Sequence, residues 1–273
     1  MSNELQGTAG KPGMSDSREP FVSIIIPAYN EVCRLEASIR ALREYLGSAR
    51  WSHEIILVVE KSSDGTLELA HRLTDRHPAF TVIGHEVQRG KGYAVRKGML
   101  RARGEIAFFM DADLSTPLPE MERFLTRFAT PPQVDVLVGN RRHPQSAILK
   151  RQAFIRRKMG QTFNALLRTI GGIQLADTQC GFKAFRRDAR EAIFSHQTID
   201  GFAFDVEVLM LAGRLGFVVE DMPVQWSNAD GSKVRMVRDS FRMLFDAVRI
   251  RRMLAAKTGK NDGGFVRQDS KSG

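Results

Sequence analysis

The sequence is short of cysteine and has no long hydrophobic run. Only two cysteines, Cys33 and Cys180, occur in 273 residues, and they lie far apart with no partner pattern. This excludes a disulfide scaffold and favours a reducing, cytoplasmic compartment. The longest apolar runs, such as Ile106–Met110, are much shorter than the roughly 20 residues that span a bilayer. Residues 1–20 are polar, so we expect neither a signal peptide nor a membrane-spanning helix.

Acidic residues are also scarce relative to basic ones. The chain has 41 Lys and Arg against 31 Asp and Glu, a net charge of +10. Residues 140–158 hold seven basic and no acidic residues, and residues 235–260 hold eight basic and two acidic ones. Each segment alone is consistent with a solvated face, but together they indicate an anionic partner: nucleic acid, a phosphorylated substrate or a membrane surface. Phe154 is the sole aromatic residue in the first segment, so we expect no nucleic-acid partner.

Short apolar runs alternate with helical patterns along the chain. We expect strands at 22–27, 54–59, 80–84, 106–111, 134–139 and 217–223, and helices at 35–46, 66–75, 92–102, 119–128, 150–169, 204–215 and 235–256. This alternation predicts an α/β fold with a mostly parallel sheet flanked by helices on both faces. The apolar strands fit burial on both sides. Segment 177–183 reads as irregular.

The domain organisation follows from composition. Residues 1–20 and 257–273 are rich in Gly, Ser and charge and are expected to be disordered. Residues 21–256 are expected to form one domain, with a nucleotide-binding half (21–140) and an acceptor-binding half (141–256).

An acidic pair, Asp111-Ala112-Asp113, follows the fourth predicted strand. Ligands collect at the carboxyl ends of parallel strands, and alternate residues of an extended chain point the same way. Two carboxylates so close together repel unless a cation lies between them, and Mg²⁺ is usually held by one or two carboxylates plus substrate phosphates. Asp-x-Asp alone is a common surface tripeptide. Phosphatases of the haloacid dehalogenase type place theirs on the first strand, so we do not favour that class.

Other loops carry further candidates. Neither Gly-x-Gly-x-x-Gly nor a P-loop motif occurs, which argues against a dinucleotide fold and a P-loop enzyme. The loop Arg89-Gly90-Lys91-Gly92 suits a phosphate, because glycine lets backbone approach closely and lysine adds charge; the alternative is an exposed turn. Asp64 could be an N-cap for the helix that follows it.

Taken in order, these motifs resemble those of the family-2 glycosyltransferases with a GT-A fold. The front half contributes Val-Ser-Ile-Ile-Ile-Pro-Ala-Tyr-Asn-Glu, Ser-Asp-Gly-Thr, Arg-Gly-Lys-Gly and Asp-Ala-Asp. In the back half Asp-Thr-Gln-Cys-Gly-Phe-Lys (177–183), Ala-Phe-Asp-Val-Glu (203–207) and Gly-Ser-Lys (231–233) resemble the dolichyl-phosphate β-glucosyltransferase branch and its bacterial relatives. The resemblance covers about residues 21–255.

The resemblance implies transfer of a sugar, glucose from UDP-glucose being favoured, to a polyprenyl or dolichyl phosphate with inversion. It assigns nucleotide-sugar binding to Pro27, Tyr29, Glu31, Glu60, Asp64, Lys91, Asp111, Ala112 and Asp113. Acceptor and phosphate binding falls to Arg141, Arg156, Gln179 and Lys233. Asp111 and Asp113 would hold Mg²⁺ or Mn²⁺. The residues expected to carry catalysis are Asp113, Arg141, Arg156 and Asp205.

The second-strand loop departs from the family pattern. The family commonly reads Val-Val-Asp-Asp-Gly-Ser-x-Asp-Gly-Thr, whereas this chain has Val-Val-Glu-Lys-Ser-Ser-Asp-Gly-Thr, one residue shorter and with Glu60 in place of the first Asp. Other readings therefore stay open: another donor, such as GDP-mannose or UDP-N-acetylhexosamine, a non-lipid hydroxyl acceptor, or a relative that binds nucleotide sugars without turnover.

The charge of the expected phosphate acceptor predicts how it would react. A phosphate monoester is largely dianionic at neutral pH, so it needs no general base, and basic residues would offset its charge and orient it. A hydroxyl acceptor would need a base, for which Asp205 is the candidate; the alternative is that Asp205 is a buried structural carboxylate.

Helix 235–256 combines an apolar stripe with arginines and could lie on an anionic membrane surface, although an apolar stripe more often packs on a sheet. We therefore expect a cytoplasmic protein, peripheral at the inner face of the membrane.

Overall fold

The structure is a computed structural model that describes residues 19–150, 175–227 and 249. Several predicted features lie outside these residues. They are the arm before residue 19, the basic helix 150–169 beyond its first residue, nearly all of helix 235–256, the tail 257–273, and the site candidates Arg156 and Lys233.

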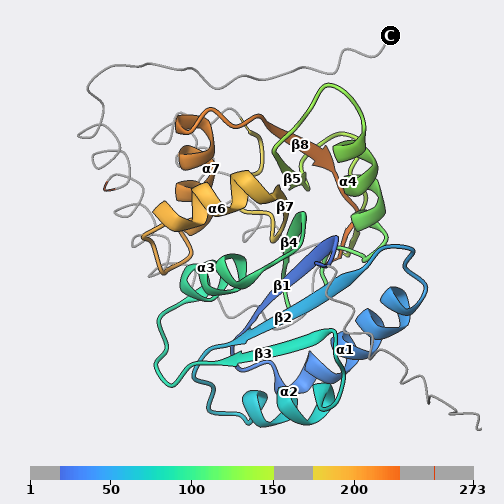
Figure 1. The fold of residues 1–273 in the computed structure, drawn as a ribbon, viewed down its shortest axis with the longest axis vertical. Helices are drawn as coiled ribbons and strands as arrows, with labels where there is room; N and C mark the ends of the chain where they lie inside the picture. The colour runs from blue at the N-terminus through green and yellow to red at the C-terminus, as the bar shows by residue number, and fades with distance from the viewer. Residues whose placement is uncertain (1–18, 151–174, 228–248, 250–273) are drawn as a thin grey trace, which may run out of the picture.

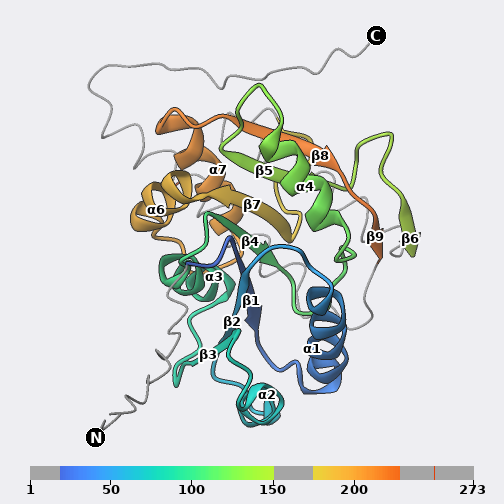
Figure 2. The same ribbon diagram turned by 45° about the vertical axis from the view of Figure 1, so that its right-hand side comes forward.

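A seven-stranded, mostly parallel sheet forms the centre of the molecule, as the sequence predicts (Figure 1). Its order is β3-β2-β1-β4-β7-β5-β8. The strands are β1 (Val22–Ala28), β2 (His53–Val59), β3 (Phe80–Gly84), β4 (Ile106–Met110), β5 (Val136–Asn140), β7 (Phe182–Arg186) and β8 (Val219–Pro223). A separate parallel pair, β6 (Ile148–Lys150) with β9 (Trp226–Ser227), lies apart from the main sheet (Figure 2).

Helices cover both faces of this sheet. They are α1 (Val32–Gly47), α2 (Thr66–Thr74), α3 (Lys91–Arg101), α4 (Glu120–Ala129), α6 (Arg187–His196) and α7 (Phe204–Arg214). Residues of α3, α6 and α7 share one buried apolar cluster with the sheet, and residues of α1, α2 and α4 share the other. Figure 1 shows α3, α6 and α7 together on one side of the strands.

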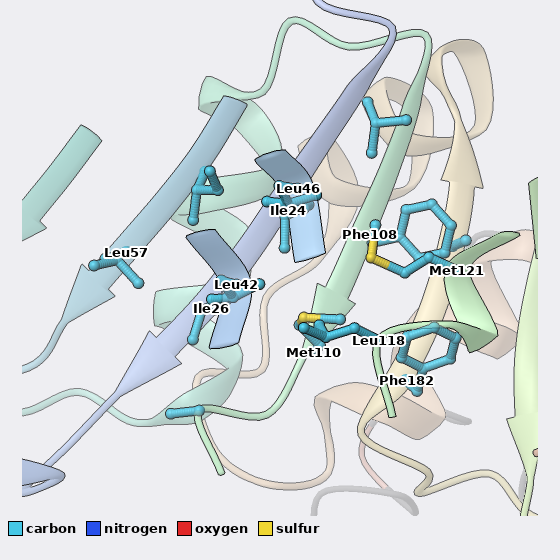
Figure 3. Packing of buried hydrophobic residues seen from close by; sticks show 14 of the residues in the cluster. Ile24, Ile26, Leu42, Leu46, Leu57, Phe108, Met110, Leu118, Met121 and Phe182 are labelled. Carbon is cyan, nitrogen blue, oxygen red and sulfur yellow. The ribbon is translucent and has the colours of Figure 1, made fainter. Parts of the chain in front are cut away.

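Alternation along the strands explains why two cores form. In β1, Ile24 and Ile26 belong to the cluster under α1, whereas Ile25 belongs to the cluster under α3, because successive side chains of a strand point to opposite faces. Figure 3 shows Ile24 and Ile26 beside Leu42 and Leu46 of α1. Burying one such side chain contributes about 1.5–3 kcal/mol.

Strand β7 corrects the sequence-based prediction. Segment 177–183 was expected to be irregular throughout, but residues from Phe182 onward form a strand that runs antiparallel to both β4 and β5. Its sequence, Phe-Lys-Ala-Phe-Arg, carries a lysine where a buried strand usually has an apolar residue, and helix α6 follows immediately. Because of these two features, the apolar pattern predicts neither β7 nor α6.

The antiparallel direction of β7 has a consequence for the site. Because β7 runs opposite to β4, it begins where β4 ends, and Met110 pairs with Phe182. The backbone N–H of Asp111 donates to the carbonyl of Gly181 (3.2 Å). Segment 177–181 therefore lies at the carboxyl edge of the parallel strands, next to the acidic pair.

Candidate active site

The acidic pair lies at the end of β4, and each of its carboxylates meets a basic side chain. Lys91 Nζ is 2.7 Å from Asp111 Oδ1, and an Arg34 guanidinium nitrogen is 3.9 Å from Asp113 Oδ2. The other oxygen of Asp113 accepts hydrogen bonds from the backbone N–H (3.0 Å) and hydroxyl (2.7 Å) of Ser115. Both carboxylates remain partly exposed, so a ligand arriving from solvent can reach them.

The donor set fits a divalent cation that shares its coordination with phosphate. Within the described part of the chain, no group of three or more His, Cys, Asp or Glu side chains is arranged to hold a metal. Two carboxylates are nevertheless enough for Mg²⁺ when substrate phosphates complete the shell. A Cβ at position 181 would collide with the Asp111 carboxylate, so Gly181 leaves room beside this group.

Helix α3 brings the predicted phosphate loop to the same place. It begins at Lys91, and its N-cap, Gly90, makes no side-chain capping bond. A helix N-terminus carries partial positive charge and favours anions. Burial alone would lower the pKa of Lys91, but the carboxylates of Asp111 and Asp205 raise it above its ordinary value. The predicted phosphate loop is therefore positively charged and faces the acidic pair.

The loops after β1 and β2 are joined to each other. The backbone N–H of Val32 donates to Asp64 Oδ2 (3.2 Å), and that of Thr66 donates to Asp64 Oδ1 (3.1 Å). The Thr66 hydroxyl in turn accepts from the backbone N–H of Glu31 (2.8 Å). Asp64 thus ties the first turns of α1 and α2 together, which fixes the edge formed by the half-buried Pro27 and Tyr29. Gly65, not Asp64, is the N-cap of α2.

Glu60 supports the phosphate loop. Its Oε2 accepts hydrogen bonds from the backbone N–H groups of Arg89 (2.7 Å) and Gly90 (2.8 Å). Burial raises the pKa of Glu60, although these two bonds act in the opposite direction.

Arg141, a predicted acceptor-binding residue, follows β5 and is held by a buried carboxylate. Its Nε is 2.7 Å from Asp177 Oδ2 and a terminal nitrogen is 2.9 Å from Oδ1, a bidentate pair. Burial alone would raise the pKa of Asp177, but the Arg141 guanidinium lowers it below its usual range. The guanidinium also lies 5.5 Å from the ring centroid of Trp226. Gln179 is half-buried two residues beyond Asp177.

Asp205 lies in the first turn of α7. It is a buried, paired carboxylate, which is the structural alternative that the sequence analysis left open. Lys183 of β7 donates to its Oδ1 at 2.5 Å and to the carbonyl of Cys180 at 2.7 Å. The two residues are 4% and 1% exposed. Burial raises the pKa of Asp205, and the neighbouring Lys183 offsets this in part.

Sequence reasoning had selected neither Asp177 nor Lys183 as a site residue, although both lie in the 177–183 motif. The presence of both residues in this motif was the signal that could have identified them. Arg34 was also missed, and its spacing of three from Glu31, with which it forms an ion pair, could have indicated it.

The fold and the acidic pair place the protein in a class: glycosyltransferases with a GT-A fold. The chain belongs to glycosyl transferase family 2, whose family model matches residues 23–194. The family and the fold inferred from the motifs are therefore confirmed, and so is an enzyme of the glycosyltransferase class.

Named relatives indicate which members of the family the chain resembles. A dolichyl-phosphate beta-glucosyltransferase from Saccharomyces cerevisiae is 35% identical over 258 residues, which cover 86% of this chain and 75% of the yeast protein. The enzyme of that name from Drosophila melanogaster is 34% identical over 234 residues, covering 82% and 72%.

Solved structures share the fold at lower identity. Glucosyl-3-phosphoglycerate synthase from Mycobacterium tuberculosis, in complex with Mn²⁺, UDP and glucosyl-3-phosphoglycerate, aligns with a TM-score of 0.59 at 20% identity, covering 94% of this chain and 88% of that one. A mannosyltransferase from Pyrobaculum calidifontis, in complex with GDP-Man and Mn²⁺, aligns with a TM-score of 0.54 at 19% identity, covering 89% and 66%.

Proposed function

We propose that the protein transfers glucose from UDP-glucose to a polyprenyl or dolichyl phosphate with inversion. The observation that carries this proposal is the similarity, at 35% identity over 86% of the chain, to a dolichyl-phosphate beta-glucosyltransferase. The acidic pair with Lys91 beside it supports a diphosphate donor. The bidentate pair of Arg141 with Asp177 supports an anionic acceptor.

The donor side requires that two negatively charged phosphates be held against two carboxylates. In the proposed reaction Asp111 and Asp113 would hold Mg²⁺ or Mn²⁺, and the ion would supply Lewis-acid stabilisation of the diphosphate leaving group. Lys91 and the N-terminus of α3 add positive charge to the same group. Pro27, Tyr29 and Glu31 border the nucleoside, on an edge that Asp64 keeps fixed.

The acceptor phosphate is itself the nucleophile. It is largely dianionic at neutral pH, so no residue has to remove a proton from it. Arg141 offsets its charge and aligns it for in-line attack on the sugar carbon, and Asp177 fixes the plane of that guanidinium. Gln179, with Arg156 and Lys233 outside the described residues, completes the proposed acceptor side. Asp205 is buried and forms an ion pair with Lys183. This environment suits a structural carboxylate better than a general base for a hydroxyl acceptor.

A lipid acceptor also calls for contact with a membrane. No helix in the described ranges is long and apolar enough to cross a membrane. We propose peripheral attachment through residues 235–256, whose sequence combines an apolar stripe with arginines. The proposed location is the cytoplasmic face of the membrane.

A panel of donors tests the reaction. Labelled UDP-glucose, GDP-mannose and UDP-N-acetylhexosamines would each be incubated with a short polyprenyl phosphate and Mg²⁺, Mn²⁺ or EDTA. The proposal expects metal-dependent transfer from UDP-glucose. Transfer from another donor alone would refute the donor assignment, and undiminished transfer in EDTA would refute the metal.

Two aspartate variants sharpen this test. In Asp113→Asn the amide oxygen still accepts the bonds from Ser115, so the fold should persist while transfer falls by about a hundredfold or more. Asp75→Asn is the matched control, because Asp75 is exposed beyond the end of α2, and it should retain full activity. Full activity of Asp113→Asn would contradict the metal assignment.

A further inference from the structure

Glu60 is enclosed at the point where three segments meet. It follows β2, and its backbone N–H donates to the carbonyl of Ala28 at the end of β1 (2.9 Å). Its side chain is 3% exposed. One carboxylate oxygen, Oε2, accepts the backbone N–H groups of Arg89 and Gly90. The other, Oε1, is buried and has no hydrogen-bond partner among the described residues.

This geometry leaves neither oxygen free to meet a nucleotide base. A carboxylate reads a base by accepting its N–H groups, which requires an oxygen that the base can approach. Oε2 already has two donors in the chain, and Oε1 is shielded from solvent. Because Glu60 is only 3% exposed, a base in solvent reaches neither oxygen in this arrangement.

Asp200 is a second contact of the same loop. The Arg89 guanidinium forms two hydrogen bonds to the Asp200 carboxylate, at 2.7 and 3.0 Å, and the Asp200 carbonyl accepts from Tyr93 N–H (3.2 Å). Gly90 has φ +128°, and a Cβ there would lie 2.5 Å from that carbonyl. Position 90 therefore requires glycine. Lys91 follows directly, and its Nζ lies 2.7 Å from Asp111 Oδ1.

We propose that Glu60 is a positioning residue for the donor diphosphate and does not read the base. By fixing the N–H groups of Arg89 and Gly90, it sets where α3 begins and where Lys91 projects. This proposal rests on the proposed function, because it assumes that Lys91 and the first turn of α3 bind the phosphates of a nucleoside diphosphate.

Ligands that differ only in their phosphates test this role. Affinities for UDP and for uridine would be measured by calorimetry and by NMR titration for the wild type, Glu60→Ala and Glu60→Gln. Loss of a charge-assisted support should weaken UDP binding by about tenfold or more in Glu60→Ala, with uridine binding unchanged. In Glu60→Gln the amide oxygen still accepts both N–H groups, so its UDP affinity should stay within about threefold of the wild type.

A double-mutant cycle shows whether Glu60 acts through Lys91. If it does, Glu60→Ala should weaken UDP binding little further once Lys91→Ala is in place, because the interaction that it positions is already gone. Glu86→Ala is the matched control, since Glu86 is an exposed acid that precedes the same loop, and it should leave both affinities unchanged.

The results that would overturn the proposal are distinct from those that would overturn the proposed function. Equal losses for UDP and uridine, a Glu60→Gln variant as weak as Glu60→Ala, or additive effects of the Glu60 and Lys91 substitutions would each refute the positioning role. A wild-type protein that binds no UDP would refute the proposed function and this role together. Urea unfolding of each variant identifies those that fail only because they do not fold.

Discussion

At the scale of single residues, two buried carboxylates near the acidic pair are each held by a basic side chain. Lys183 pairs with Asp205, and Arg141 pairs with Asp177. Forming such a pair adds little net stability, because desolvation offsets attraction, but removing one partner leaves an uncompensated buried charge. Alanine substitution at these positions therefore reports on folding before it reports on catalysis.

Arg141→Ala should illustrate this. Asp177 is fully buried, so the variant should lose about 3–5 kcal/mol of unfolding free energy, measured by urea denaturation. Arg141→Lys keeps the charge without the bidentate geometry and should lose less, which makes it the better probe of acceptor binding. Arg142→Ala, at the exposed neighbouring position, should change stability by only about 0.5 kcal/mol. A loss that small for Arg141→Ala would contradict the account.

The loss in Arg141→Ala should also depend on pH. In the wild type the pKa of Asp177 is lowered by Arg141. The pair's contribution is thus present above the ordinary aspartate pKa and is lost as pH falls through the lower folded value. Without Arg141, burial would raise that pKa instead. The stability difference between the two proteins should therefore be largest near neutrality and shrink as the pH falls, because protonation of Asp177 removes both the stabilisation in the wild type and the buried charge in the variant. A difference that grows in acid would contradict this account.

At the scale of helices and strands, α3 depends on close approach to the sheet. A Cβ at Gly98 would press on Ile25 of β1 and Val58 of β2. Glycine is a poor helix former, so its place in the middle of α3 reflects packing: the missing side chain lets the helix, and Lys91 at its start, lie near the carboxyl edge of the sheet.

Two glycine substitutions separate packing from helix propensity. Gly98→Ala should destabilise the protein by about 1–3 kcal/mol, because the added methyl overpacks the core. Gly47→Ala, at the last residue of α1 where nothing lies within 4 Å, should be neutral or stabilising by up to about 1 kcal/mol. Thermal or urea unfolding measures both, and equal effects would contradict the packing argument.

The regular elements of the front half could be predicted because their apolar spacing agrees with their structure. The predicted 22–27 and 106–111 fall within one residue of β1 and β4. Strand β7 could not be predicted in this way, because Lys183 interrupts its apolar pattern and its partner Asp205 is distant in sequence. The same limit applies to the site: the motifs located Asp111 and Lys91, but the contacts of Glu60 with the 89–90 backbone depend on the fold.

At the scale of the whole molecule, the charge is uneven. Segment 140–158 carries +7 and segment 235–260 carries +6, so the rest of the chain carries a net −3. Basic residues near an anionic membrane contribute about 1 kcal/mol each, and the attraction decays over a Debye length of about 8 Å at physiological salt. This distribution suits the proposed reversible attachment to a membrane.

Vesicle binding tests this attachment. The protein should sediment with vesicles containing anionic phosphatidylglycerol, weakly with pure phosphatidylcholine, and less as salt rises. Replacing Arg242, Arg249 and Arg252 together with Ala should reduce binding by about tenfold or more. The matched control replaces three exposed arginines near α1 and α2, Arg43, Arg72 and Arg76, and changes net charge equally. Equal losses in the two triple variants would mean that net charge, not the 235–256 segment, determines binding.

The central claim is that a phosphate group accepts the sugar. The measurement that tests it most directly compares a short polyprenyl phosphate with the corresponding polyprenol, each incubated with labelled UDP-glucose and Mg²⁺, and counts the label extracted into organic solvent. The account predicts labelled lipid from the phosphate and none from the alcohol, since no residue is proposed to deprotonate a hydroxyl. Glucose on the alcohol, or no product from the phosphate when UDP binds, would contradict it.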